Sequence, residues 1–104
     1  MTTMKDREDG FEKKFALDEE QRFKALARRN KLLGLWAAEK LGKTGSDAEA
    51  YAKEVVVADL QGHDGSFGKI RRDLDAAGVE QSDHQIHRTM EELMATAIEQ
   101  VKNG

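Results

Sequence analysis

The sequence contains no cysteine and no proline. Without cysteine the chain can form neither a disulfide nor a thiolate metal site, which fits a reducing compartment. Without proline, glycine is the main residue that interrupts a helix, so the nine glycines mark the expected helix ends and turns. These two absences favour helices joined by glycine-containing turns.

Long apolar runs are also missing. The longest one spans only a few residues, whereas a membrane-spanning helix needs about 20. The first ten residues, MTTMKDREDG, are charged and lack the apolar core of a secretory signal. We therefore expect a soluble, cytoplasmic protein with no direct membrane insertion. With 104 residues, it is expected to form one domain with a modest core.

Charge is plentiful but unevenly distributed. Charged residues make up 36% of the chain, and the net charge is −3. Residues 1–31 carry a net charge of +2, whereas residues 32–104 carry −5. Residues 22–31 contain five basic side chains and no acidic one. The pattern predicts a basic segment joined to an acidic body.

The first two predicted helices are separated by Gly42 and Gly45. The first begins between residues 11 and 18 and ends at residue 41. Ser46 is expected to open the second helix through a capping box with Glu49. The positions expected to face the core are Phe23, Leu26, Ala27, Leu33, Ala37 and Leu41 in the first helix, and Tyr51, Ala52, Val55, Val56 and Leu60 in the second.

The segment GHDGSFG, residues 62–68, is predicted to be a loop that precedes the third helix. Gly78 is expected to end that helix. The fourth helix is expected to begin at Ser82, with a capping box through Gln85. The expected core positions are Phe67, Ile70, Leu74 and Ala77 in the third helix, and Ile86, Met90, Leu93, Met94, Ala97, Ile98 and Val101 in the fourth. The predicted fold is all-α, a four-helix bundle.

Two residues of the first predicted helix indicate close packing. Gly34 costs about 1 kcal/mol relative to alanine in a helix, so we expect a neighbouring helix to approach closely there. Trp36, the only tryptophan, is expected to anchor the core or a contact between helices.

The first seventeen residues differ from the remainder. Eight charged residues lie between positions 5 and 14, and the large apolar side chains are Phe11, Phe15 and Leu17. Such a segment buries too little apolar surface to offset its ordering entropy. We expect a flexible arm over residues 1–17 that is mobile when free and folds on a partner, and a helical bundle over residues 18–104.

Other motifs are weaker. LGKTGS, residues 41–46, resembles the end of a phosphate-binding loop but lacks the first glycine and the preceding strand. Weak adenine-nucleotide binding stays open there, because phosphates favour helix N-termini and lysines. His84 and His87 have helical spacing but no evident third ligand, so we expect no metal.

The sequence shows no candidate active site, since no nucleophile accompanied by a base and an acid is apparent. We therefore expect no catalytic residue and no required cofactor. The basic residues 22–31 are a feature of nucleic-acid-binding proteins. However, the net charge is negative and no nucleic-acid-binding motif accompanies them. A small helical domain that senses nucleotide or binds nucleic acid is the alternative function.

Residues 6–42, DREDGFEKKFALDEEQRFKALARRNKLLGLWAAEKLG, resemble the start of the zeta subunit of the ATP synthase of alpha-proteobacteria. The fingerprint is the pair Phe15 and Phe23 followed by ARRNKLLGLWAAE, residues 27–39. The resemblance extends over essentially the whole chain, and the second half agrees mainly in length, pattern and YAKEVVVADL.

The resemblance implies a four-helix bundle whose N-terminal arm inhibits ATP hydrolysis. In that family the arm inserts at a catalytic interface between alpha and beta subunits, contacts the gamma stalk and blocks rotation. It implies a protein peripheral to the inner membrane through the synthase, with no nucleic-acid partner. The partner-binding residues it implies here are Asp6, Arg7, Phe11, Lys14, Phe15, Leu17 and Phe23.

Overall fold

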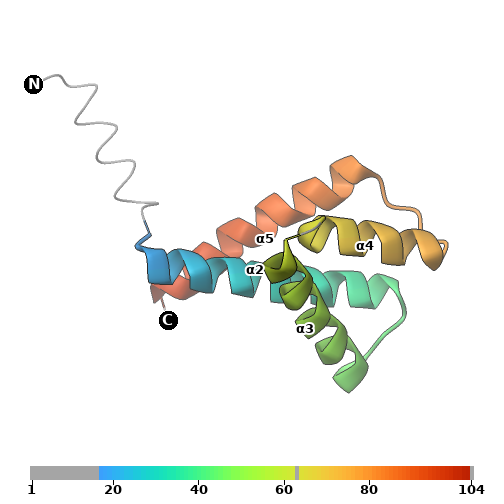
Figure 1. Ribbon diagram of the computed structural model, residues 1–104, viewed down its shortest axis with the longest axis horizontal. Coiled ribbons are helices and arrows are strands. Elements are labelled where there is room, and N and C mark those ends of the chain that lie inside the picture. The colour runs from blue at the N-terminus through green and yellow to red at the C-terminus, as the bar shows by residue number, and fades with distance from the viewer. Residues whose placement is uncertain (1–16, 63, 104) are drawn as a thin grey trace, which may run out of the picture.

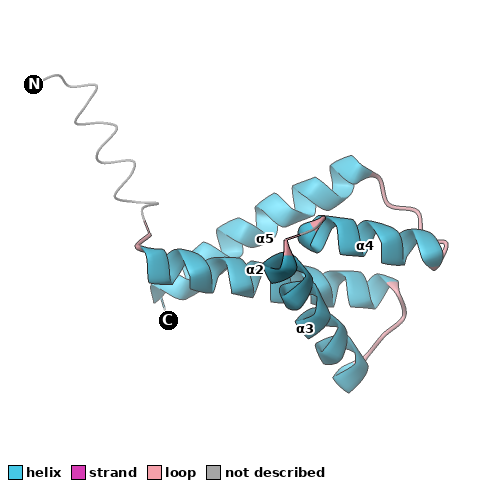
Figure 2. Ribbon diagram, in the orientation of Figure 1, coloured by secondary structure: helices cyan, strands magenta, loops and turns pink. Residues whose placement is uncertain are grey.

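The computed structural model describes residues 17–62 and 64–103, and this part of the chain is helical without any strand (Figure 2). The four helices are α2 (Glu19–Lys40), α3 (Gly45–Gln61), α4 (Gly65–Ala76) and α5 (Asp83–Asn103). The predicted all-α class and four-helix bundle are confirmed. The predicted arm lies outside the described residues except for Leu17.

Helix α2 is the centre of the bundle, because it contacts each of the other three helices. Figure 1 shows α3 crossing α2 obliquely and α5 running beside α2, while α4 packs mainly against α3. The N-terminal end of α2 and the C-terminal end of α5 lie together at one end of the molecule (Figure 1). Residues 1–16 therefore precede the helix that organises the whole fold.

Capping boxes begin two helices, and the one before α5 was predicted. Asp18 accepts a hydrogen bond from the backbone N–H of Gln21 at 2.7 Å, and the Gln21 side chain accepts one from the Asp18 N–H at 3.3 Å. Ser82 and Gln85 form the expected reciprocal pair before α5, at 3.1 and 3.0 Å. Such boxes satisfy backbone donors that the first turn leaves free.

Two predicted boundaries are wrong. Ser46 does not open the second helix: α3 begins at Gly45, and the carbonyl of Thr44 accepts from the N–H groups of Asp47 and Ala48. The reason is that Gly45 adopts a positive φ of 57°, which turns the chain into the helix before Ser46 is reached. Ser46 therefore lies inside the first turn.

The predicted loop over residues 62–68 is also shorter than expected, because α4 already begins at Gly65. The carboxylate of Asp59 accepts from the Ser66 N–H at 3.1 Å, which satisfies a donor of the first turn. Gly68 lies directly against the side chain of Asp64, so a Cβ at position 68 would collide with it. The glycine serves packing there rather than a loop.

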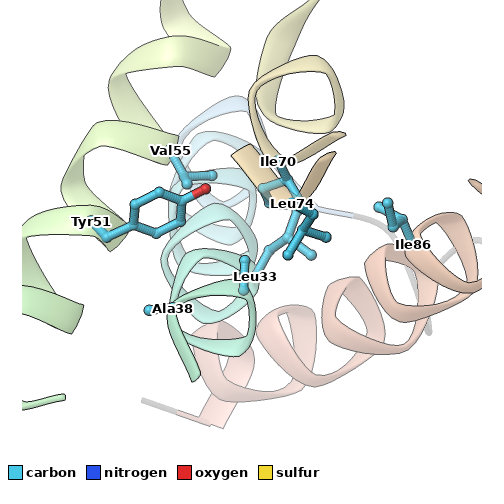
Figure 3. Close-up of a cluster of buried hydrophobic side chains, with 8 residues drawn as sticks. Leu33, Ala38, Tyr51, Val55, Ile70, Leu74 and Ile86 are labelled. Atoms are coloured by element: carbon cyan, nitrogen blue, oxygen red, sulfur yellow. The ribbon is translucent and has the colours of Figure 1, made fainter. Parts of the chain in front are cut away.

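The core is built from medium-sized and small side chains, drawn in Figure 3. Its members are fully or almost fully buried: Leu33, Ala37, Ala38, Tyr51, Val55, Ile70, Leu74 and Ile86. All four helices contribute, and Trp36 packs partly buried against the cluster, as an anchor between helices was expected to do. Deleting such a buried side chain typically costs about 2–5 kcal/mol.

Close contact between α2 and α3 occurs at Gly34, as predicted. An added Cβ on Gly34 would lie 2.6 Å from the Cα of Ala52 and 3.3 Å from the Cβ of Val55. The distance of 2.6 Å is too short for a real contact, and the Ala52 atom belongs to the backbone, whereas the distance of 3.3 Å to Val55 is merely tight. The two helices therefore touch because position 34 has no side chain.

Four residues that were expected to face the core are exposed instead, and one of them is Ala77, which lies just past the end of α4. Phe23 and Leu26 of α2 are 61% and 37% exposed, and Leu60 of α3 is 66% exposed. In the first two turns of α2, Ala25 is the one buried residue. The other side chains there stay at least partly exposed because no other described helix covers them. The helical periodicity of these apolar residues was predicted correctly, but no other helix in the described part of the chain packs against the face on which they lie.

None of the helices in residues 17–62 and 64–103 is both long and apolar enough to cross a membrane.

Candidate functional site

A groove of about 920 Å³ runs along the N-terminal half of α2, between α3 and α5. Its lining combines apolar and basic side chains with one carboxylate, that of Glu49, and the other principal residues are Phe23, Lys24, Arg28 and Lys31 of α2, Val56 of α3 and Val101 of α5. We call this surface the basic groove. It lies at the end of the bundle where α2 begins.

The basic character comes from one face of α2. Lys24, Arg28 and Lys31 are spaced by four and three residues, so their side chains follow one another along the same face. Lys24 pairs with Glu20 at 3.0 Å and Lys31 with Glu49 at 3.8 Å, and all four side chains are more than half exposed. Such exposed pairs contribute little to stability and open easily.

Arg28 differs from its two neighbours in the groove. Its Nη1 donates to the Gln100 amide oxygen of α5 at 3.2 Å, a neutral acceptor. Within the described part of the chain, Arg28 has no ion pair with a carboxylate. The bond fixes the guanidinium between α2 and α5 and leaves its positive charge without a paired carboxylate on the groove wall.

Two large apolar side chains in or near the groove are exposed. Phe23 lies at its edge with 61% of its surface exposed. Leu60 follows Val56 by one helical turn on α3, so it extends that apolar face, and it is 66% exposed. Fully burying a side chain of this size is worth about 1.5–3 kcal/mol. A partner that buries these side chains would therefore gain binding free energy from them.

A polar contact behind the groove positions α2 against α3 and α4. Asn30 is 2% exposed, and its Nδ2 donates to Oδ2 of Asp59 at 2.9 Å. The other carboxylate oxygen of Asp59 accepts from the Ser66 N–H, and Arg29 Nε donates to the Asn30 Oδ1 at 2.9 Å. One carboxylate thus links three helices and holds the basic face of α2 outward.

The charge of Asp59 is stabilised where it lies. Partial burial by itself would raise the pKa of this carboxyl, but hydrogen bonds from Asn30 and Ser66, with the attraction of Arg29, outweigh it and lower the pKa. The carboxylate is therefore ionised at neutral pH and accepts all of these bonds.

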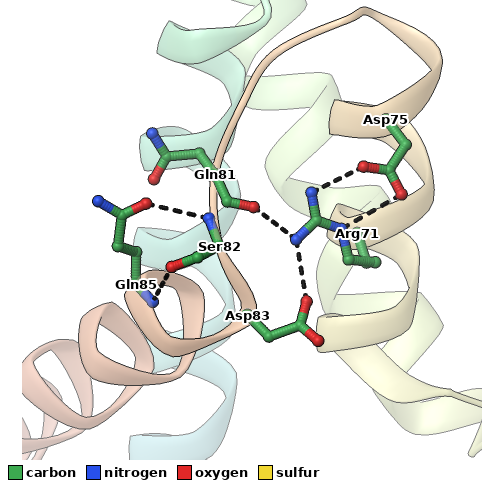
Figure 4. Close-up of polar contacts among 6 residues, drawn as sticks. All are labelled: Arg71, Asp75, Gln81, Ser82, Asp83 and Gln85. Carbon is green, nitrogen blue, oxygen red and sulfur yellow. Dashed lines mark hydrogen bonds and ion pairs between the residues drawn. The ribbon is translucent and has the colours of Figure 1, made fainter.

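A second polar cluster joins α4 to α5 and is drawn in Figure 4. Arg71 donates to both carboxylate oxygens of Asp75, at 3.3 and 2.7 Å, to the Gln81 carbonyl at 2.6 Å and to Asp83 at 2.9 Å. The two carboxylates raise the pKa of Arg71. This clamp holds the connection between the helices, and its polar groups are used within the fold rather than offered to a ligand.

A third cluster lies between α3 and α4. Tyr51 donates from its hydroxyl to Asp73 at 2.8 Å, and Lys69 pairs with Asp73 at 3.0 Å while its Nζ stands 5.0 Å from the centre of the Tyr51 ring. Burial, and then the bond to Asp73, raises the pKa of Tyr51 well above its ordinary value. These residues also satisfy one another.

The structure describes two of the seven predicted partner-binding residues. Leu17 is half-buried just before the capping residue of α2, and Phe23 is exposed on the groove edge. The other five, Asp6, Arg7, Phe11, Lys14 and Phe15, lie outside the described residues. The structure therefore places Phe23 at the edge of the basic groove, whereas the predicted arm stays a prediction.

The weaker motifs have structural roles. Thr44 of LGKTGS is the residue before α3, and Lys43 Nζ stands 5.9 Å from the centre of the Tyr51 ring. His87 stacks on Phe67 with ring centroids 4.3 Å apart, a contact between α5 and α4. Among the described residues, no group of three His, Cys, Asp or Glu side chains gathers as a metal site requires.

The sequence analysis did not predict that residues of α3 and α5 line the basic groove. Val56 was expected in the core, and Gln100 received no role, although it fixes Arg28. No local signal marks these residues, because they meet α2 only after the chain has folded. The basic run at residues 22–31 was visible, but which of its residues share a face with Val56 was not.

Taken together, the fold and the groove define a small helical protein that presents exposed apolar and basic side chains at one end, as a protein-binding module does. The sequence profile of the family of ATPase inhibitor subunit zeta matches residues 1–100. The chain therefore belongs to this family of ATP synthase inhibitors, and its role is regulatory.

The solved structures agree with the fold. A protein determined by solution NMR is 46% identical to this chain, with a TM-score of 0.68. The match covers 79% of this chain and 95% of that one. No curated protein sequence matches the chain.

Proposed function

We propose that residues 1–17 form an inhibitory arm that inserts at a catalytic interface between the alpha and beta subunits of the ATP synthase head. There the arm also contacts the gamma subunit and blocks rotation in the direction of ATP hydrolysis. The observation that carries the proposal is the family match, which spans residues 1–100 and therefore includes the arm as well as the bundle.

The composition of the arm supports this role. Phe11 and Phe15 are four residues apart, so a helix formed on binding would place both rings on one face. Rings buried at the centre of an interface usually supply most of the affinity. Asp6, Arg7 and Lys14 surround them with charges of both signs, and such charges at the rim mainly steer and orient the complex.

The bundle supports the arm from behind. Leu17 and the cap at Asp18 connect the arm to α2, and the extended backbone of Asp18 separates any helix formed by the arm from α2. Phe23 then lies near the entrance of the partner with its ring already exposed. The site in this proposal is accordingly a binding site without catalytic residues, and the protein joins the membrane-bound synthase from the cytoplasmic side.

Truncation tests the proposal. The purified cognate catalytic head is assayed for ATP hydrolysis with the full chain and with a variant that lacks residues 1–16. We expect the full chain to inhibit and the truncated variant to lose inhibition while it keeps its helical circular dichroism. Full inhibition by a folded truncated variant would refute the role of the arm.

The proposal requires no cofactor. Weak adenine-nucleotide binding near Lys43 and Thr44 is tested separately, by titrating ATP and ADP into the protein while amide chemical shifts are followed. Shifts confined to the residues around Lys43 would support a nucleotide site, and their absence at millimolar ligand would remove it.

A further inference from the structure

We infer that the basic groove is a second docking surface, which receives an acidic amphipathic helix from a subunit of the ATP synthase head. The inference rests on the proposed function for the identity of the partner complex. Its own support is the geometry and charge of the groove, which the arm hypothesis does not use.

Charge complementarity determines the acidic character of the occupant. The whole chain carries a net charge of −3, yet this face of α2 presents three cations along two turns. Lys24 and Lys31 each pair with one exposed carboxylate, of Glu20 and Glu49, whereas Arg28 meets the neutral Gln100 amide. An ammonium group carries three donors, so each lysine can still donate to a further carboxylate. A segment with carboxylates would satisfy these donors, whereas a basic one would be repelled.

The spacing of the cations determines its shape. Positions 24, 28 and 31 repeat every three to four residues, which spans about 10 Å at the rise of an α-helix. A second helix with acids at the same spacing matches them one to one. Its apolar face then meets Phe23, Val56 and Val101, which belong to three different helices of this chain. This is the arrangement of an amphipathic helix bound in an apolar groove.

The apolar floor also separates a protein partner from a nucleic acid. Phosphate backbones need cations but not aliphatic side chains, and single-stranded bases need aromatic rings on which to stack. Phe23 is the one aromatic residue lining the groove within the part of the chain described, and the other apolar lining is aliphatic. A helix that carries carboxylates on one side and aliphatic residues on the other uses both features.

The chain's own residues 1–16 fit less well. They carry four acidic and four basic side chains, so they bring no net negative charge to the groove. The proposed function also assigns Phe11 and Phe15 to the catalytic interface. The groove lies beside the point where these residues join α2, so a partner that holds the arm is within reach of the groove in the same complex.

Zero-length cross-linking tests the contact directly. A carbodiimide joins a lysine amine to a carboxylate with which it is in contact, so the full chain is treated with it in complex with the cognate head. We expect peptides that join Lys24 or Lys31 to an aspartate or glutamate of one head subunit. Links from these lysines only to residues 1–16, or only to a second copy of this chain, would overturn the inference.

Charge reversal tests the energetic contribution. The variant R28E/K31E and the control K53E/R88E change the net charge equally, but Lys53 and Arg88 lie outside the groove. We expect the groove variant to bind the head roughly tenfold more weakly and with a flatter salt dependence, while the control stays within about twofold of the natural chain. Equal effects of the two variants would overturn the inference.

A further result separates this inference from the proposed function. If truncation of residues 1–16 abolishes inhibition but the groove variant binds like its control, only the groove assignment fails. If the truncated chain still inhibits and the groove variant does not, the arm hypothesis fails and the groove carries the inhibitory contact. Circular dichroism of each variant confirms that it is folded.

Discussion

Asn30 of α2 and Asp59 of α3 are joined by a hydrogen bond of 2.9 Å from the amide of one to the carboxylate of the other. Asn30 is almost fully buried, so its amide has no water to replace this partner. The bond also fixes the rotation of α2, which turns Asn30 inward and the neighbouring Arg28 and Lys31 toward the groove.

Replacing Asp59 by alanine should destabilise the bundle by about 1–3 kcal/mol at neutral pH, because the buried Asn30 amide loses its acceptor. Since folding lowers the pKa of Asp59, this stability is present above its ordinary value of 3.8 and is lost as the pH falls below it. Urea unfolding at pH 7 and pH 3 measures the effect. A difference between the two proteins that stays the same at both pH values would contradict the assignment.

Replacing Gly34 by alanine should lower the free energy of unfolding by about 1–3 kcal/mol, because the new Cβ would overlap the Cα of Ala52. This expected loss runs against helix propensity, because alanine in place of glycine would by itself stabilise the helix by about 1 kcal/mol. Thr96→Ala, on the exposed side of α5, is the control and should not destabilise. Thermal unfolding of both variants gives the comparison, and a stabilised Gly34 variant would rule out the close contact.

Replacing Phe11 and Phe15 together by alanine should weaken inhibition of the cognate ATPase by about tenfold or more, because buried aromatic rings dominate interface energies. The thermal midpoint of the free protein should not change. Val57→Ala, which trims a half-exposed apolar side chain of α3, serves as the control. A large drop in the thermal midpoint of the double variant would show instead that the rings belong to the protein's own core.

Tyr51 should resist ionisation for as long as the protein is folded. Burial of the ring and its bond to Asp73 raise the pKa of Tyr51 above the ordinary 10.0. A raised pKa on an acid means that this stability is intact below pH 10.0 and is lost as the pH rises beyond it. Tyr51 is the only tyrosine, so phenolate absorbance reports it alone.

The phenolate signal should therefore appear together with the loss of helical circular dichroism, and in strong denaturant it should appear near the ordinary value. Tyr51→Phe is the control, because it removes the absorbance and the hydrogen bond but keeps the ring. Ionisation of Tyr51 near pH 10 in a protein that is still helical would contradict its burial.

Much of the fold could be predicted from local patterns. The number of helices, the cap at Ser82 and the close approach at Gly34 all follow from residues near one another in sequence, and each is confirmed. The capping box at Ser46 failed because the glycine before it already starts the helix. The loop at residues 62–68 failed because Asp59, outside that segment, supplies an acceptor to the new first turn.

The candidate site was less predictable. The basic run at residues 22–31 was evident, yet the expectation that Phe23, Leu26 and Leu60 lie in the core was wrong. Helical spacing shows which residues share a face but not whether another helix covers that face. Whether a stripe becomes core or binding surface is decided by the packing of distant segments.

The sequence by itself determined that this protein is helical, that glycines divide residues 17–62 and 64–103 into four helices, and that its first residues bring more charge than apolar surface. Those properties follow from propensity, periodicity and composition, which act over a few residues. Only the tertiary structure decided that α2 is central, that Asn30 turns inward, and that Arg28 meets Gln100 beside an exposed Phe23. These relationships join positions up to 72 residues apart, and such contacts exist only once helix packing has excluded water between them.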